Sequence, residues 1–278
     1  MKRHPFTALV CSLLVVMMPS SSHAAHSRRR VVIARERDTY DRVITDFSPD
    51  GRLLQVEYGM EAARRGSLIA AARSSVGICL VIHNSSFGKM HRIDHHIWLM
   101  TAGLSGDARF LATHLRKGCQ QHRLNYGEAP TTEEVAKMAG DFQHYLTRAG
   151  GIRPLGCTGV VLGVDPVLDE DRVGIPRVFQ TEPGGIVEAC PLYCAIGQGS
   201  DVVSKDLASL KFDDAATLEQ TALMMAQSVL EKIDNPKTVD VWMIEPRSGN
   251  RGGMQATCYR RISKDCTLML SGLTPDNA

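Results

Sequence analysis

The stretch YDRVITDFSPDGRLLQVEYGMEAARRGS, residues 40–67, decides how the rest of the chain is interpreted. Residues 48–51, SPDG, predict a tight turn, because proline sets φ at the second position and glycine supplies the permissive end. Gly66 predicts the end of the helix that follows. The Gly66-Ser67 step then precedes an apolar strand, where a nucleophile could be exposed. The helix itself is predicted by apolar residues at near-helical spacing: Leu53, Val56, Met60 and Ala63.

Bulk composition bounds the class of protein. The chain has 278 residues, which is enough for one large domain or two small ones with a sizeable core. Hydrophobic residues make up 44% and charged residues 22%, as is usual for soluble globular proteins. The formal charge of +2 gives no reason to expect nucleic acid or an acidic membrane as the main partner. We therefore expect no nucleic-acid partner and no membrane partner.

The chain has eight cysteines but no CxxC pair, so zinc-site and thioredoxin-like spacings are absent. Cys79 and Cys157 lie inside apolar runs, which predicts buried free thiols in a reducing compartment. Cys190 and Cys194 flank a predicted strand turn and are expected to be buried rather than bridged. We predict no metal site and no cofactor.

The N-terminus differs in character from the rest of the chain. Residues 1–39 combine a basic start, an apolar run over residues 6–18 and small residues after it. This pattern is typical of a secretory signal peptide, and the apolar run is too short to span a bilayer comfortably. A mitochondrial presequence and a wrongly included upstream start codon stay open. The predicted organisation is an N-terminal extension, residues 1–39, and one domain, residues 40–278.

Beyond residue 40 we find no internal repeat and no linker. Residues 67–72 and 76–82 predict a β-hairpin, and Ser105 is expected to cap a helix. Thr131 and Glu134 form a predicted capping box for the next helix. Its buried stripe is expected at Val135, Met138, Phe142, Tyr145 and Ala149. Further strands are predicted at 96–103, 156–164, 177–181, 185–190, 192–196, 239–245 and 255–262, and further helices at 201–210 and 217–233.

Strands, two helices, strands, two helices and strands thus follow one another along the chain. Two sheets stacked between helix layers would satisfy this order. The segments YDRVITDFSPDGRLLQVEY and EAARRGS resemble the N-terminal signature of proteasome α-type subunits. The resemblance continues through RIDHHI, TAGLSGDARFL, GGIRPLGCTGVVLGVD, EPGG and AIGQGS, about residues 40–235, and leans toward the fourth α type. It implies the α+β, four-layer αββα sandwich of N-terminal-nucleophile hydrolases.

The resemblance also implies a function. Such a chain is a non-catalytic α subunit of the 20S core particle, placed in its heptameric outer ring in the cytoplasm and nucleus. It gates substrate entry to β-subunit active sites and docks activators for ubiquitin-dependent degradation. The implied partners are neighbouring α subunits, the β ring, and the ATPase regulatory particle or other activators.

Two sets of site residues follow from the same resemblance. The first set forms a cluster between neighbouring subunits that holds the open gate: Tyr40, Asp41, Pro49 and Tyr58. In the second set, Lys89 receives the C-terminal carboxylate of an activator, and the segment between Ile82 and Lys89 is shorter than in relatives by about a hairpin. The rest of that pocket is implied to consist of Leu53, Ala62, Gly103 and Leu104.

An enzymatic alternative places a self-processing nucleophile at Ser67. Proteolytic β-type relatives cleave after a glycine and use the freed threonine, which a lysine and an aspartate activate. Residues 74–88 contain neither aspartate nor lysine, so Ser67 is predicted to lack its base. A secreted relative that binds rather than gates is a further alternative, and it requires loss of the N-terminal segment and oxidation of some cysteines.

Overall fold

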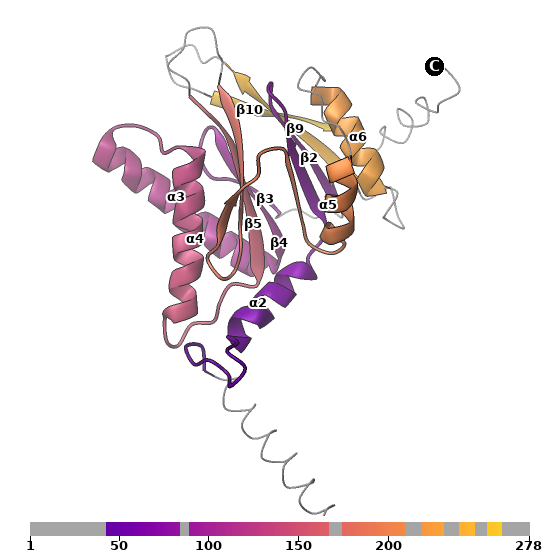
Figure 1. Cartoon of the computed structure of the whole chain (residues 1–278). Coiled ribbons are helices and arrows are strands. Elements are labelled where there is room, and N and C mark those ends of the chain that lie inside the picture. The colour runs from indigo at the N-terminus through magenta and orange to yellow at the C-terminus, as the bar shows by residue number, and fades with distance from the viewer. Residues whose placement is uncertain are drawn as a thin grey trace, which may run out of the picture.

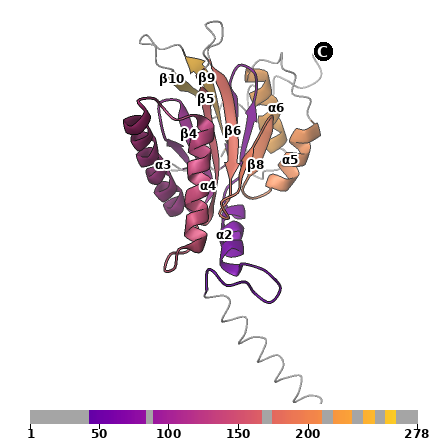
Figure 2. The same cartoon turned by 60° about the vertical axis from the view of Figure 1, so that its left-hand side comes forward.

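The structure is a computed structural model that describes residues 43–83, 89–166, 174–209, 218–230, 239–247 and 255–262. Two five-stranded antiparallel sheets lie face to face, and helices cover the outer face of each (Figures 1 and 2). The predicted α+β, four-layer αββα sandwich is therefore confirmed.

The first sheet has the strand order β10-β9-β2-β1-β8. The predicted hairpin is confirmed, because β1 pairs with β2 from Ile69 opposite Ile82 to Arg73 opposite Ile78. β1 also pairs with β8 on its other side. The strand bounds are β1 Ile69–Arg73, β2 Ile78–His83, β8 Tyr193–Ile196, β9 Val239–Arg247 and β10 Gln255–Ile262.

The second sheet has the order β3-β4-β5-β6-β7. Its edge strand β3 was not predicted, because a three-residue segment carries too little pattern and becomes a strand only by pairing with Trp98–Met100 of β4. The other strands agree with the predicted ones within a few residues. The bounds are β3 Met90–Arg92, β4 Ile97–Gly103, β5 Cys157–Asp165, β6 Ile175–Thr181 and β7 Val187–Ala189.

Helices α3, Ser105–Tyr126, and α4, Thr132–Arg148, cover the second sheet, and α5, Ser200–Ser209, and α6, Leu218–Leu230, cover the first (Figure 2). Helix α2, Leu54–Arg64, lies across one end of the sandwich (Figure 1). It is the helix that the opening stretch predicts.

The core follows from strand alternation. Ile78, Leu80 and Ile82 of β2 point between the sheets, toward Met100 and Leu162 of the opposite sheet. The intervening residues of β2, Cys79 and Val81, pack instead against α5 and α6. Because both faces of each sheet are covered, these central strands consist of continuous apolar runs.

The capping box of α4 is confirmed: the Thr131 side chain accepts from the Glu134 N–H while the Glu134 side chain accepts from the Thr131 N–H. The cap predicted at Ser105 is wrong. Ser105 is the first residue of α3, and Leu104 occupies the N-cap position without a side-chain bond. Asp107 lies in the first turn, where a negative charge favours a helix N-terminus.

The predicted stripe of α4 is partly wrong. Val135 is fully buried, but Tyr145 is 60% exposed. The face against the second sheet lies about one residue further round the helix, where small side chains allow close contact. Val187 packs so closely on Gly140 that a Cβ there would collide with it. The buried residues of α4 are Thr132, Val135, Ala136, Ala139, Gly140, Gln143, Leu146 and Thr147.

Candidate functional site

The Gly66-Ser67 step, which we call the Gly66 passage, takes the chain from α2 into β1. It is enclosed by the ends of two other strands. A Cβ on Gly66 would collide with the backbone nitrogen of Gly103 at the end of β4. On the other side the Gln198 N–H donates to the Gly66 carbonyl at 2.8 Å, and a Cβ on Gly197 would collide with the Ser67 carbonyl oxygen. The backbone of the passage is therefore packed against backbone.

Gly103, at the end of β4, cannot be replaced by a residue with a side chain without strain. Gly103 has a φ of 116°, and a Cβ there would collide with the Gly156 carbonyl oxygen and lie 3.0 Å from the Ala63 Cα. Glycine alone adopts this conformation readily. The close approach of α2 to β4 thus depends on glycine at both positions.

The surroundings of Ser67 offer little to activate a hydroxyl. The His83 N–H donates to the Leu68 carbonyl at 2.9 Å, so His83 ends the strand beside the passage. Burial, helped by the charge of Lys89, lowers the pKa of the His83 imidazole and favours its neutral form. The Lys89 Nζ is buried with no hydrogen-bond partner among the described residues, and burial lowers its pKa. Among those residues no carboxylate forms an ion pair with Lys89.

A hollow of about 490 Å³ opens beside the passage, and we call it the α2 hollow. Three residues implied for the activator pocket meet there: Ala62, Gly103 and Leu104. The other two do not line it. Leu53 is the N-cap of α2, at the far end of that helix from Ala62, and Lys89 precedes β3. The described residues that line it are Tyr58, Glu61, Ala62, Arg65, Gly66, Gly103 and Leu104.

Arg65 is a residue of this hollow that the sequence reasoning missed. Its Nε donates to the Glu61 carboxylate at 3.0 Å, and its side chain is 78% exposed. Its position one turn after Glu61, on the face that carries Ala62, is the signal that could have identified it. The hollow therefore has an accessible cation of its own.

The wall of the α2 hollow is held by a carboxylate of α3. Asp107 accepts from the Arg153 guanidinium at 2.7 and 2.8 Å and from the Gly156 N–H at 2.8 Å. Burial by itself would raise the pKa of Asp107, but these bonds outweigh burial and the pKa is lowered. The Leu104 N–H in turn donates to the Gly156 carbonyl at 3.0 Å. The segments TAGLSGD and GGIRPLGCT, far apart in sequence, thus meet at one wall.

The residues implied for the gate are only partly placed. Tyr40 and Asp41 lie outside the described residues. Pro49 is exposed in the predicted turn, which the Gly51 N–H closes by donating to the Ser48 carbonyl at 2.8 Å. Tyr58 is 50% exposed on α2 and lines the hollow.

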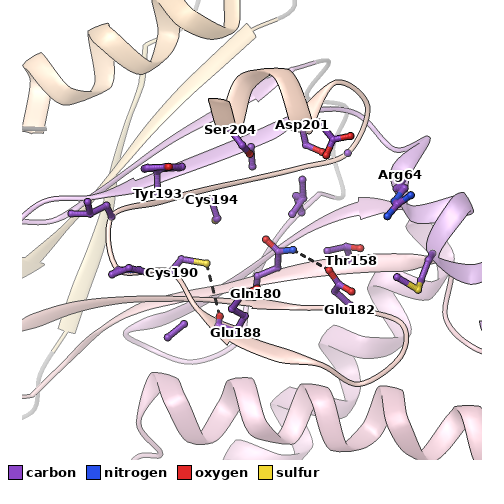
Figure 3. Close-up of a pocket in the computed structure, with 18 of the residues that line it drawn as sticks. Arg64, Thr158, Gln180, Glu182, Glu188, Cys190, Tyr193, Cys194, Asp201 and Ser204 are labelled. Carbon is purple, nitrogen blue, oxygen red and sulfur yellow. Dashed lines mark hydrogen bonds between the residues drawn. The ribbon is translucent and has the colours of Figure 1, made fainter. Parts of the chain in front are cut away.

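A second cavity, of about 510 Å³, lies where the chain passes from β7 to β8, and we call it the β7–β8 cavity (Figure 3). Side chains of both signs line it, among them Arg64, Glu182 and Asp201. Cys190 and Cys194 also line it. The prediction of buried free thiols is confirmed for Cys79, Cys119, Cys157, Cys190 and Cys194.

His96 and Asp94 of the segment KMHRIDHHIW make structural contacts. The His96 ring lies 3.1 Å, Nε2 to oxygen, from the Pro130 carbonyl, and the Asp94 carboxylate accepts from Arg123 at 2.7 Å. Within the described ranges, no group of three or more histidine, cysteine or acidic side chains could hold a metal ion. No described helix is both long and apolar enough to cross a membrane.

Two protein families match this chain. The family described as proteasome subunit matches residues 59–244, from α2 into β9. The N-terminal signature of A-type proteasome subunits matches residues 40–62, which include the turn and most of α2. Together the two matches contain both the Gly66 passage and the β7–β8 cavity.

Individual relatives agree with these families. The proteasome alpha subunit of Archaeoglobus fulgidus is 34% identical over 220 residues, which cover 74% of this chain and 85% of the relative. The proteasome alpha type-7 subunit of Cicer arietinum is 32% identical over 222 residues, covering 76% and 86%. The proteasome alpha subunit of Methanococcus maripaludis is 35% identical over 218 residues, covering 74% and 80%. Archaeal and plant α subunits are thus about equally similar to this chain.

Proposed function

This chain belongs to the proteasome subunit family and carries the N-terminal signature of its α type, and from that premise we propose that it is a non-catalytic outer-ring subunit of the 20S core particle. In that place it assembles with other proteasome subunits. The proposal includes the finer functions that the sequence implies, namely gating of substrate entry and docking of activators.

The packing of the Gly66 passage is the observation that carries the non-catalytic assignment. Cleavage before Ser67 would remove α2, whose Val56, Gly59 and Ala63 are buried. It would also remove Gly66, whose backbone fills the space between Gly103 and Gly197. Among the residues that the structure describes, a nucleophile freed there would find neither the carboxylate nor the hydrogen-bonded lysine that its activation requires. An intact α2 is therefore part of the folded protein.

The gating proposal rests on exposure at the α2 end of the sandwich. Pro49 and Tyr58 present an apolar ring and a phenol to solvent there. Tyrosine side chains of this kind are suited to interfaces, because the ring packs and the hydroxyl hydrogen-bonds. We propose that these two residues contact a neighbouring subunit, together with Tyr40 and Asp41.

For activator docking we propose the α2 hollow, with Arg65 as its accessible cation. A guanidinium on a concave surface can bind a chain-terminal carboxylate in a bidentate manner. The Lys89 ammonium, implied by the resemblance, has its Nζ buried in the chain. If Arg65 binds the carboxylate, substitution of Arg65 should weaken binding; if Lys89 binds it, substitution of Lys89 should. Variants of the two residues therefore distinguish the two assignments.

The outer-ring assignment is tested by native mass spectrometry of the complex purified from its source, with release of single subunits. A released subunit whose mass includes residues upstream of Tyr40, ejected from a particle with β subunits, supports the proposal. A chain that begins at Ser67 would overturn it and make the protein a self-processing hydrolase. The same mass reports how much of residues 1–39 is retained.

The docking assignment is tested with a synthetic peptide corresponding to an activator C-terminus, with a free carboxylate, and the same peptide amidated. Binding to the assembled particle is compared for Arg65→Ala and Lys89→Ala. We expect the free-acid peptide to lose about tenfold in affinity with Arg65→Ala, as befits one charge-assisted pair. Loss confined to Lys89→Ala would assign the carboxylate to Lys89 instead, and equal binding of the amidated peptide would exclude both cations.

We propose the cytoplasm and nucleus as the location of this protein. The buried free thiols support a reducing compartment. Imaging of the chain with a C-terminal tag tests this, and a signal confined to the secretory pathway would contradict it.

A further inference from the structure

The chain passes from one sheet to the other between β7 and β8, and a cysteine lies on each side of that passage. Cys190 is held at the second sheet, because its N–H donates to the Val178 carbonyl of β6 at 2.9 Å. Cys194 lies in β8 of the first sheet, where it pairs with Ala71 of β1. Both residues line the β7–β8 cavity (Figure 3). Two thiols from opposite sheets thus share one cavity.

The two thiols interact with each other. Interaction with the Cys194 thiol lowers the pKa of Cys190, and the same interaction raises the pKa of Cys194. Cys190 is 8% exposed and Cys194 6%, and the Cys190 Sγ donates to the Glu188 carbonyl oxygen at 3.9 Å. Two thiols that interact within one cavity are the arrangement that a reversible dithiol requires, and Cys190 lies in the connecting segment while Cys194 lies in a strand.

The other described buried cysteines serve as a reference. Burial raises the pKa of Cys79, Cys119 and Cys157 to about 12 in each case. None of these residues lines the β7–β8 cavity. Thiols of that kind are packed into the core and are inert to oxidants.

We propose that Cys190 and Cys194 form a redox-active dithiol, which a peroxide converts to a reversible disulfide joining the two sheets. The Cys190 thiolate attacks one peroxide oxygen and breaks the O–O bond, giving a sulfenic acid and a hydroxide, which leaves as water with the proton that the Cys190 thiol released on ionising. The Cys194 sulfur then attacks the Cys190 sulfur and displaces the second hydroxide, which leaves as water with the thiol proton. Two electrons pass from the two thiols to the peroxide, and a small thiol reductant reverses the change.

This inference is independent of the proposed function, since it rests on the passage between the sheets and on the cavity. The cavity volume of about 510 Å³ exceeds what a water-sized oxidant needs. The consequence is mechanical: oxidation would tie the edge of one sheet to the edge of the other beside the start of α5. Ser200 and Asp201 at that start line the same cavity.

The sequence makes the test direct, because Arg177 and Lys205 delimit a tryptic peptide, residues 178–205, that contains Cys190 and Cys194 and no other cysteine. The full-length chain is treated with hydrogen peroxide, alkylated under denaturing conditions, digested and weighed. We expect this peptide to lose two hydrogen atoms in mass and to take up no alkylating reagent. Prior reduction with dithiothreitol should restore alkylation at both thiols.

Three variants separate the roles of the two thiols. With Cys194→Ser the sulfenic acid has no resolving thiol, so Cys190 should be trapped as an adduct of dimedone. Cys190→Ser should give neither adduct nor disulfide. Cys119→Ala, which changes a buried thiol away from the cavity, should leave disulfide formation unchanged. Wild-type thiols that both stay alkylatable after peroxide, or a sulfinic acid at Cys190 beside an alkylatable Cys194, would overturn the proposal.

Discussion

The Gly66 passage, which leads from α2 into β1, and the passage of the chain from β7 in one sheet to β8 in the other are built in opposite ways. At the first, backbone packs on backbone and fills the space between Gly103 and Gly197. At the second, a cavity of about 510 Å³ is left, with two thiols on its wall. The comparison teaches that the passage before β1 is filled by backbone, while polar and thiol side chains gather around the passage between β7 and β8.

The physical reason for the difference is side-chain volume. Glycine has no Cβ, so three chain segments can touch at the first passage through their peptide groups. The segment between β7 and β8 consists of Cys190, Pro191 and Leu192, and its backbone bonds to both sheets: the Cys190 N–H donates to the Val178 carbonyl at 2.9 Å, and the Leu192 carbonyl accepts from the Arg73 N–H at 2.7 Å. Pro191 and Leu192 are exposed. The side chains of this segment line a cavity, whereas those of the glycines at the first passage are absent.

The largest expected effect is that of Gly66→Ala, which inserts a methyl group into the filled passage. The methyl would collide with the Gly103 nitrogen, so backbone must move, and we expect a loss of at least about 3 kcal/mol in the free energy of unfolding. Denaturant unfolding followed by circular dichroism measures it.

Gly106→Ala is the matched control, because a Cβ there meets no atom within 4 Å and the site lies in α3. We expect stability to stay equal or to rise by up to about 1 kcal/mol. A Gly66→Ala protein as stable as this control would show that the passage is not filled.

A smaller effect is expected for Asp107→Asn, which weakens the wall beside the filled passage. The bonds to Arg153 and to the Gly156 N–H lose their charge, and we expect a loss of about 1–3 kcal/mol at neutral pH. Denaturant unfolding at a series of pH values measures it.

The pH dependence has a definite sign. The folded-state pKa of Asp107 is lowered, so its contribution is fully present above the unfolded-state pKa of about 4 and is lost as the pH falls through the folded value. The difference between wild type and Asp107→Asn should therefore shrink on acidification. Asp141→Asn, an exposed carboxylate of α4, removes the same charge and should cost little at any pH. A difference that persists in acid would contradict the assigned role of the charge.

A substitution at the N-terminus of α4, away from both passages, should have an intermediate effect on stability and gives a reference for the other variants. Thr131→Ala removes the capping box of α4 and should lower the free energy of unfolding by about 1 kcal/mol. Ser105→Ala, at the position where the predicted cap is wrong, should change it by less than about 0.5 kcal/mol. The free energy of unfolding is measured by thermal or denaturant unfolding. Equal losses in the two variants would show that Ser105 does cap α3.

The smallest effect on stability is expected where a larger side chain is placed in the β7–β8 cavity. Ser204 lies on α5 and lines the β7–β8 cavity, so Ser204→Leu can place its larger side chain in open space. We expect the free energy of unfolding to change by less than about 0.5 kcal/mol, since leucine is also the better helix former. A loss as large as that of Gly66→Ala would mean that the two passages do not differ.

Local rules predicted most of the elements. The turn at residues 48–51, the helix after it and the capping box at Thr131 depend on residues close in sequence, and all three form as predicted. The hairpin of β1 and β2 follows from two apolar runs with a short polar connection. The stripe of α4 was misjudged because the neighbouring sheet, rather than the helix itself, decides which face is buried, and the cap at Ser105 was misjudged because α3 begins at that residue and not after it.

The candidate site was predicted in part for the same reason. Ala62, Gly103 and Leu104 come together as the family resemblance implies, while Leu53 and Lys89 lie elsewhere in the described chain. Arg65 and the β7–β8 cavity were missed. A hollow has no local signal, since its walls come from segments far apart in the sequence.

By itself the sequence determined the family, the order of the helices and of the strands other than β3, and the absence of an aspartate or lysine between residues 74 and 88. These depend on residue identity and on short-range periodicity. Only the tertiary structure decided that Gly66 fills the passage before β1 and that Cys190 and Cys194 share a cavity at the passage between β7 and β8. Whether such a passage is filled or hollow depends on the volume of side chains that several distant segments bring to one point, and no single segment contains that information.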